Sequence, residues 1–186
     1  MRNQAVYMTS LKEMETRELE VPVPEGDQVL VKLDYVGICG SDVHYYEHGR
    51  IGDFVVNGDF ILGHECAGTV VAAGAGAKHL KPGDRVALEP GATCGQCEFC
   101  KSGRYNLCPD VEFLATPPFD GCLTNYMVYP ESLAFKLPDH VSTREGALVE
   151  PLAVGLHAAS QAGVQLGETV VVLGAGCIGL MSLLAS

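Results

Sequence analysis

The 186-residue sequence contains no tryptophan and has few basic residues. Twelve Lys and Arg side chains stand against 23 Asp and Glu, so the formal net charge is -11 at pH 7. Because few cations are available to offset phosphate charge, this balance argues against a nucleic-acid partner and against an anionic membrane surface. The apolar share of 47% is too high for intrinsic disorder, so the sequence predicts a folded domain with a core.

Long apolar runs are also scarce. Residues 1–16 contain none that could serve as the core of a secretory signal peptide, so we predict a cytoplasmic protein. In that reducing compartment, the eight cysteines favour metal binding or catalysis over disulfides. Residues 169–186 carry no charge and reach the lower limit of a membrane span, but their glycines and β-branched stretch favour a buried strand and helix. This run stops without a helix cap, which predicts a truncated chain.

Short apolar segments separated by Gly and Pro fill the first part of the sequence. Residues 29–36 alternate apolar and polar side chains, as a half-buried strand does, and residues 68–73 and 85–88 form two further strands. The turn at 81–84 contains Pro, Gly and Asp, which suit a tight bend. This pattern predicts a small barrel or a partly open β domain.

The pattern becomes helical after residue 141. Ser142 and Glu145 have the spacing of a capping box, and Pro151 suits the first turn of a second helix that ends at Gly163. A VVVLG strand, a glycine-rich turn and an AGCIGLMSLLA helix follow, in the order that opens a βαβ unit. The predicted fold class is therefore mixed β and α/β.

Four cysteines form the most specific local motif, C-x2-C-x2-C-x7-C, at Cys94, Cys97, Cys100 and Cys108. Four thiolates fill every position of a tetrahedral zinc ion, so the motif predicts a structural site. Two disulfides or an iron–sulfur cluster are the alternatives. The last spacing is longer than in bacterial ferredoxins and no second cysteine set exists, which favours zinc.

A second candidate metal site combines Cys39 in GICGSDVH, His64 and Glu65 in LGHE, and Glu150 in EPL. A thiolate, an imidazole and a carboxylate give zinc three protein ligands and leave one position open, as in a catalytic site. Nothing in the spacing brings these segments together. Each residue alone also has an ordinary structural interpretation, such as a buried thiol.

A glycine motif, G-x-G-x-x-G, lies between the predicted strand and the last helix, at Gly174, Gly176 and Gly179. In that context glycines permit a tight turn and let the backbone approach a pyrophosphate at the helix N-terminus. The acidic residue that separates NAD from NADP is expected about 20 residues later, beyond Ser186.

Taken together and in this order, the motifs GICGSDVH, LGHE, KPGDRVALEPG, the four cysteines, EPL and VLGAGCIG resemble the zinc-dependent medium-chain dehydrogenases. HYYEHGRIGDFVV, GRYNLCPDVEFLATPPFDG and EGALVEPLAVGLHA resemble the sorbitol (L-iditol 2-) and xylitol dehydrogenase branch. The resemblance covers essentially the whole chain. It implies a GroES-like catalytic domain at 1–150 with a structural-zinc lobe at 91–110, then a linker helix and the start of a Rossmann domain at 151–186.

The resemblance also implies roles for the metal-site residues. Cys39 and His64 match the family's catalytic zinc ligands, and Glu65 matches a carboxylate that the polyol branch uses as a ligand. Glu150 stands where many alcohol dehydrogenases carry a cysteine ligand. Its role stays open between a direct ligand and a partner of the zinc-bound water.

Further residues around this site match by resemblance. Ser41 matches the family's hydroxyl near the substrate oxygen. His44 matches an outer member of a proton relay. Tyr45 and Phe113 fall where the polyol branch lines its substrate pocket. The three glycines match the NAD-binding turn.

The implied reaction is oxidation of a secondary hydroxyl of a small-molecule polyol to a ketone, with Zn2+ polarising the hydroxyl and NAD accepting hydride. Full-length members of the family often form homotetramers. One strand and one helix cannot make a dinucleotide crevice, so we predict that the fragment alone is inactive. The alternatives are a threonine, alcohol or glucose dehydrogenase of the same family, or a non-enzymatic module that is either a four-cysteine metal-binding unit or ferredoxin-like.

Overall fold

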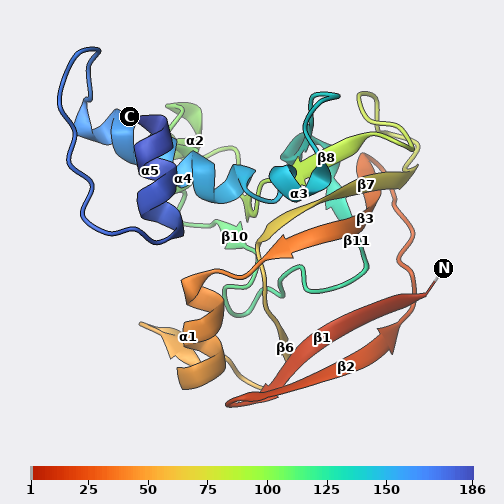
Figure 1. Cartoon of the computed structure of the whole chain (residues 1–186). Helices are drawn as coiled ribbons and strands as arrows, with labels where there is room; N and C mark the ends of the chain where they lie inside the picture. Colours follow the sequence, from red (N-terminus) through yellow and green to blue (C-terminus); the bar gives the residue numbers. More distant parts are fainter. Residues whose placement is uncertain (1) are drawn as a thin grey trace.

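The computed structural model describes residues 2–186 and shows a β-rich body with the C-terminal helices packed at one side (Figure 1). The strands are β1 (Asn3–Ser10), β2 (Glu13–Leu19), β3 (Gln28–Gly37), β4 (Arg50–Ile51), β5 (Phe54–Val55), β6 (Phe60–Ile61), β7 (Glu65–Ala73), β8 (Arg85–Leu88), β9 (Gly91–Ala92), β10 (Glu112–Phe113), β11 (Tyr126–Pro130) and β12 (Ala134–Lys136). The helices are α1 (Gly40–His48), α2 (Glu98–Lys101), α3 (Thr143–Gly146), α4 (Val149–Ala162) and α5 (Cys177–Ala185), with short 3-10 turns η1 (Tyr105–Leu107) and η2 (Glu131–Leu133).

The main sheet has five strands in the order β11-β3-β7-β8-β12, and each neighbouring pair is antiparallel. Its core consists of β-branched side chains that alternate along the strands, including the fully buried Val29, Val31, Val70 and Val86. The predicted strands at 29–36, 68–73 and 85–88 are confirmed as β3, β7 and β8. The sheet thus follows from local alternation of apolar and polar residues.

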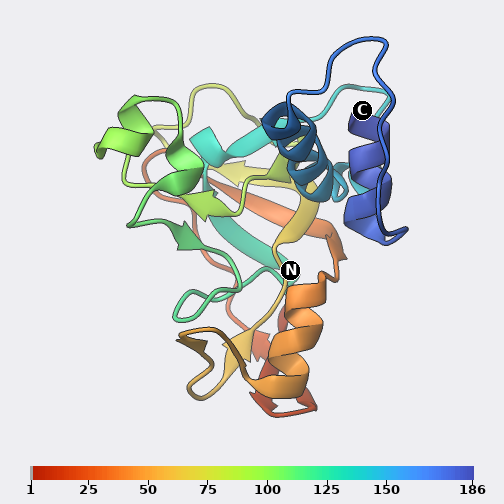
Figure 2. The same cartoon turned by 90° about the vertical axis from the view of Figure 1, so that its left-hand side faces the viewer.

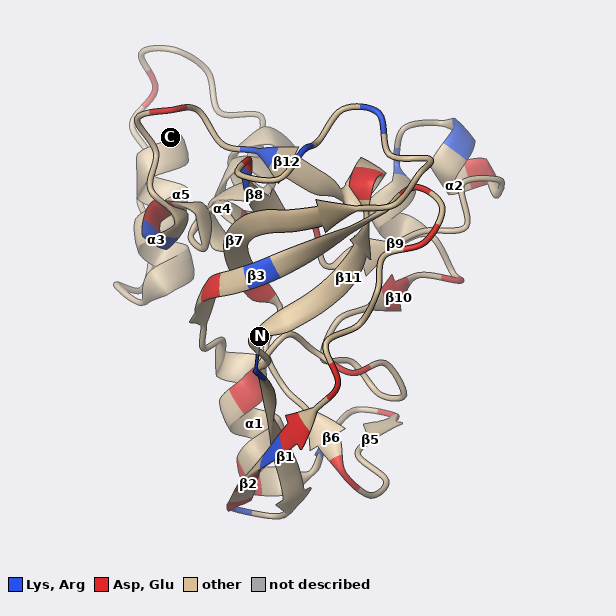
Figure 3. Ribbon diagram, turned by 90° about the vertical axis from the view of Figure 1, so that its right-hand side faces the viewer, with Lys and Arg blue, Asp and Glu red and all other residues tan. Residues whose placement is uncertain are grey.

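A second sheet, in the order β2-β1-β6, supports helix α1. The core cluster between them contains Met8, Tyr45, Phe60 and Leu62, all at most 5% exposed. Charged positions are dispersed along the ribbon in Figure 3, with basic positions on β3, α2 and β12 and acidic ones on α1, β2 and β10.

The predicted helical region is confirmed. Ser142 and Glu145 make the capping box of α3: the Ser142 N–H donates to the Glu145 carboxylate at 2.8 Å, and the Glu145 N–H donates to the Ser142 hydroxyl at 3.2 Å. Helix α4 ends at Gly163, whose φ of 68° is the left-handed conformation expected at a helix end. Within residues 2–186, no helix combines the length and the apolar character that crossing a bilayer requires.

The predicted strand at 170–173 is wrong, because the structure has no strand in this segment. A strand of a parallel sheet forms only when neighbouring strands satisfy its backbone, and the described part of the chain places no strand beside it. Val171 and Leu173 are accordingly 77% and 95% exposed. The helix after it is confirmed as α5, so the structure has the turn and the helix of the predicted unit but not the strand.

Candidate metal centres and an adjoining cleft

The four predicted cysteines converge in a lobe around α2. The Cys97 and Cys100 sulfurs lie 3.4 Å apart, and those of Cys94 and Cys100 lie 4.0 Å apart. Four sulfurs around one tetrahedral zinc ion, with bonds of about 2.3 Å, are separated by about 3.8 Å. Backbone N–H groups of Gln96 and Cys97 favour the thiolate and lower the pKa of Cys94 to about 7. The lobe therefore has the geometry of a closed, structural zinc site.

These distances also decide between the alternatives for the lobe. A disulfide needs sulfurs about 2.05 Å apart, and every cysteine in residues 2–186 is a free thiol. An iron–sulfur cluster is itself several ångströms wide and would hold its cysteine sulfurs further apart. Zinc is the ion that the donor set fits.

The sheet topology brings the second candidate site together. Cys39 follows β3 directly and caps α1, whereas His64 and Glu65 lie at the start of β7. Because β3 and β7 are antiparallel neighbours, with Gly37 opposite Glu65, the end of one strand meets the start of the other. One ligand atom from each of Cys39, His64 and Glu65 lies within 4.8 Å of the others. Glu150 is outside this set.

His64 gives independent support for an ion at this position. Its Nδ1 atom is buried and has no hydrogen-bond partner among the described residues. The nearest carboxylate oxygen, on Asp42, is 3.8 Å away, which is too long for a hydrogen bond. A histidine that binds a metal through one ring nitrogen usually turns the other toward a carboxylate, and Asp42 is placed for that role.

Asp42 is a functional residue that sequence reasoning missed. It is 3% exposed, and its two oxygens accept hydrogen bonds of 2.8 Å from the N–H groups of Cys39 and Gly63. It therefore ties the backbone beside both ligand-bearing segments. The C-x-x-D spacing at the start of α1, that of an N-cap and its N3 residue, is the signal that could have indicated this role.

Two other predicted residues lie beside this centre. Glu150, on α4, is half-buried, and burial together with the carboxylates of Glu65 and Asp42 raises its pKa, while His64 opposes that shift. Phe113 packs against His64, with ring centroids 5.6 Å apart. Both residues therefore surround the three donors without belonging to them.

The remaining predicted residues lie on α1. Ser41 is half-buried in its first turn, and His44 is exposed, 4.6 Å from the ring of His48. Tyr45 is 3% exposed and packs edge-on against Phe60 in the core. Its substrate contact stays a prediction, since the structure places it in the core.

A cleft of about 510 Å3 joins the metal donors to the glycine turn. Cys39 and Glu65 line one side of it, and all three predicted cofactor glycines line the other: Gly174, Gly176 and Gly179. The turn is tight, because a Cβ atom at Gly179 would lie 2.1 Å from the carbonyl oxygen of Gly174, whose own φ is 117°. This volume is that of a small-molecule site.

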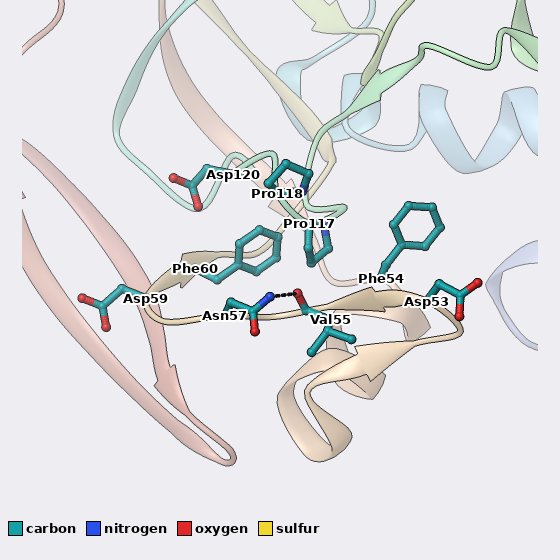
Figure 4. A pocket seen from close by; sticks show the side chains of 9 residues that line it. All are labelled: Asp53, Phe54, Val55, Asn57, Asp59, Phe60, Pro117, Pro118 and Asp120. Atoms are coloured by element: carbon teal, nitrogen blue, oxygen red, sulfur yellow. Dashed lines mark hydrogen bonds between the residues drawn. The ribbon is translucent and has the colours of Figure 1, made fainter.

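A second hollow, of about 440 Å3, lies beside β5 and β6 and contains none of the predicted site residues (Figure 4). Figure 4 shows the carboxylates of Asp53, Asp59 and Asp120 pointing away from one another. Asp59 pairs with Arg17, and Asp120 accepts the Ile61 N–H at 2.9 Å. The three carboxylates therefore do not converge on a ligand.

The alcohol dehydrogenase GroES-like domain model matches residues 25–139. The chain belongs to this family. It is 52% identical over 182 residues to sorbitol dehydrogenase of Bacillus subtilis (strain 168), which is 98% of this chain and 52% of that protein. The match confirms the predicted fold class and family, including the GroES-like domain. The chain spans about half the length of the curated relatives it matches.

Solved structures of this family agree. An oxidoreductase/dehydrogenase of unknown specificity from Escherichia coli superposes with a TM-score of 0.93 at 53% identity, over 100% of this chain and 54% of that one. A short chain alcohol dehydrogenase from Escherichia coli CFT073, complexed with NADH, has a TM-score of 0.86 at 30% identity, over 97% and 51%. The GroES-like family match leaves no support for the ferredoxin-like alternative.

Proposed function

We propose that this chain forms the zinc-holding part of a polyol dehydrogenase, which oxidises a secondary hydroxyl to a ketone with NAD as hydride acceptor. One observation carries the proposal: Cys39 and Glu65 share a single cleft with the glycine turn. Hydride transfer needs the hydroxyl and the nicotinamide side by side, and this cleft is where they would meet. The similarity to sorbitol dehydrogenase supports a polyol as the substrate.

Cys39, His64 and Glu65 would hold a catalytic zinc ion, and the four lobe cysteines would hold a structural one. When bound, zinc supplies a Lewis acid that lowers the pKa of a hydroxyl, and NAD supplies the hydride acceptor. The protein keeps the three donors in place through Asp42, which fixes the backbone at Cys39 and Gly63. Phe113 covers one face of His64 and so helps to keep water out.

The proton from the hydroxyl needs an acceptor and a route to solvent. Glu150 has a pKa raised by burial, which suits it to hold a proton near the donors. Ser41 and His44 are three residues apart on α1, so their side chains neighbour each other on the helix surface. Because Ser41 is half-buried and His44 is exposed, we assign them the outward path of the proton.

The wider setting of the protein is also part of the proposal. We assign residues 1–150 to the catalytic domain and 151–186 to a linker helix and the start of a Rossmann domain, in which the glycine turn contacts the NAD pyrophosphate. The protein acts on a small-molecule polyol in the cytoplasm, as part of a homo-oligomer, with no nucleic-acid or membrane partner. The acidic composition and the similarity to sorbitol dehydrogenase support this setting.

A chimera tests the proposed activity. The C-terminal half of Bacillus subtilis sorbitol dehydrogenase is fused after residue 186, since this chain matches 52% of that protein. We expect NAD-dependent oxidation of sorbitol or xylitol by the chimera, none by its Cys39→Ala variant, and none by the 186-residue chain alone. A folded chimera with two zinc ions that oxidises only threonine, glucose or simple alcohols would contradict the polyol assignment.

A further inference from the structure

We infer that Gly37 is a positioning residue of the centre formed by Cys39, His64 and Glu65, because its missing side chain leaves the space in which the Glu65 carboxylate lies. The inference rests on the proposed function, which makes Glu65 a metal ligand. It concerns the residue that decides whether this carboxylate can reach the ion.

The contact between the two residues is very close. Gly37 ends β3 and is the register partner of Glu65, the first residue of β7. A Cβ atom at position 37 would lie 2.2 Å from Glu65 Oε2, 3.0 Å from its Cβ and 3.2 Å from its Cδ. The first of these distances is far inside van der Waals contact. An alanine and the present position of the carboxylate therefore exclude each other.

A glycine is required at position 37 because a side chain there would have no space, and not because of its backbone conformation. Gly37 is not among the residues with positive φ, so an alanine would adopt its backbone angles without strain. The three nearest atoms to the added Cβ all belong to the side chain of Glu65. By contrast, a Cβ at Gly68 would lie 2.1 Å from the carbonyl oxygen of Lys32 and would disturb the sheet itself. Substitution of Gly37 is thus a perturbation directed at one side chain, that of Glu65.

The Glu65 side chain has little space into which it could rotate. It is 7% exposed, and its carboxylate oxygen lies within 4.8 Å of ligand atoms of both Cys39 and His64. Rotation away from a Cβ at position 37 takes the carboxylate out of the place from which it shares an ion with them. The centre would then keep two good donors instead of three, and its affinity for a metal would fall.

The test measures metal binding rather than turnover. The 186-residue chain is prepared with zinc in the four-cysteine site, and Co2+ is then titrated into the other centre while its absorption spectrum is followed. For Gly37→Ala we expect at least about tenfold weaker Co2+ binding and a changed absorption spectrum. Loss of residues that orient metal ligands commonly has an effect of this size. Gly40→Ala is the matched control, because a Cβ at Gly40 would have no atom within 4 Å. The Gly40→Ala variant should bind Co2+ like the wild type.

A double-mutant cycle shows whether Gly37 acts through Glu65. In a Glu65→Gly background neither the carboxylate nor the Cβ of residue 65 lies beside position 37, so adding Gly37→Ala should weaken Co2+ binding no further. Equal binding by the wild type and Gly37→Ala, or a full additional loss in the Glu65→Gly background, would overturn the inference and leave the proposed function standing. A wild-type chain that binds no metal at this centre would overturn both. An unchanged far-UV circular dichroism spectrum, together with zinc retained in the four-cysteine site, shows that each variant is folded.

Discussion

The two candidate metal centres are built in different ways. The four cysteines lie within 15 residues of chain, so their lobe is a local structure, whereas Cys39 and the His64–Glu65 pair are joined only by the pairing of β3 with β7. Figure 2 shows the lobe around α2 and the helices α4 and α5 at opposite sides of the β-rich body. The local centre can support folding without an open position, while the long-range one lies at a cleft where chemistry can occur.

The largest effect is expected where zinc and folding are most tightly linked. Replacing Cys97 by Ser should abolish zinc binding in the lobe and leave residues 91–113 open to limited proteolysis, because the described lobe has little apolar core of its own. The main sheet should persist, and so should binding of the second ion. Mass spectrometry of the proteolytic fragments and of bound zinc checks this outcome. Loss of both ions together would show that the two centres are not independent.

Asp42 offers a way to weaken the long-range centre without touching a ligand. Asp42→Asn replaces one acceptor oxygen with an amide donor, which leaves the N–H of Cys39 or Gly63 buried without a partner. We expect a loss of about 1–3 kcal/mol in unfolding free energy and about 10- to 100-fold in metal affinity at this centre. Urea unfolding and chelator competition measure the two effects. Asp53→Asn, at an exposed position, is the control and should change neither.

The cleft can be altered from its glycine side. Gly179→Ala introduces a Cβ 2.1 Å from the carbonyl oxygen of Gly174, whereas Gly176→Ala introduces one with nothing within 4 Å. Overpacking of this kind costs about 1–3 kcal/mol. In the chimera described above, the first variant should therefore bind NAD more weakly than the second, with both zinc ions retained. Titration of NADH fluorescence gives the affinities, and affinities of both variants equal to that of the unsubstituted chimera would mean that the turn does not contact the cofactor.

The smallest effect concerns acid stability far from both centres. Glu131 accepts N–H bonds from Lys78, His79 and Leu80, and these bonds lower its pKa below the ordinary value of 4.5. A carboxylate with a depressed pKa contributes stability above its ordinary pKa, and that contribution is lost as the pH falls through the folded value. The Glu131→Gln variant should therefore be less stable than the wild type at pH 7. Its free energy of unfolding should also fall less than that of the wild type on acidification below about pH 4.5. Thermal unfolding across that range provides the comparison.

The sequence predicted what depends on local pattern. Alternation of side chains predicted β3, short apolar runs predicted β7 and β8, the Ser142 capping box predicted α3, and cysteine spacing predicted the lobe. The centre formed by Cys39, His64 and Glu65 was predicted only from the family resemblance, because no local pattern indicates that Cys39 lies near His64. The strand at 170–173 was wrong because its formation depends on neighbouring strands. The contact of Asp42 with Cys39 is local and follows the C-x-x-D spacing, but its contact with Gly63 exists only in the folded chain.

The proposed function depends most on a single ion held by Cys39, His64 and Glu65. Anomalous diffraction at the zinc absorption edge, from crystals of the chain grown with zinc, locates each bound ion directly. We predict two peaks, one enclosed by the four cysteines and one within bonding distance, about 2.0–2.3 Å, of Cys39 Sγ, a His64 nitrogen and a Glu65 oxygen. A single peak in the cysteine lobe, with Cys39 and His64 ordered and no density between them, would contradict it.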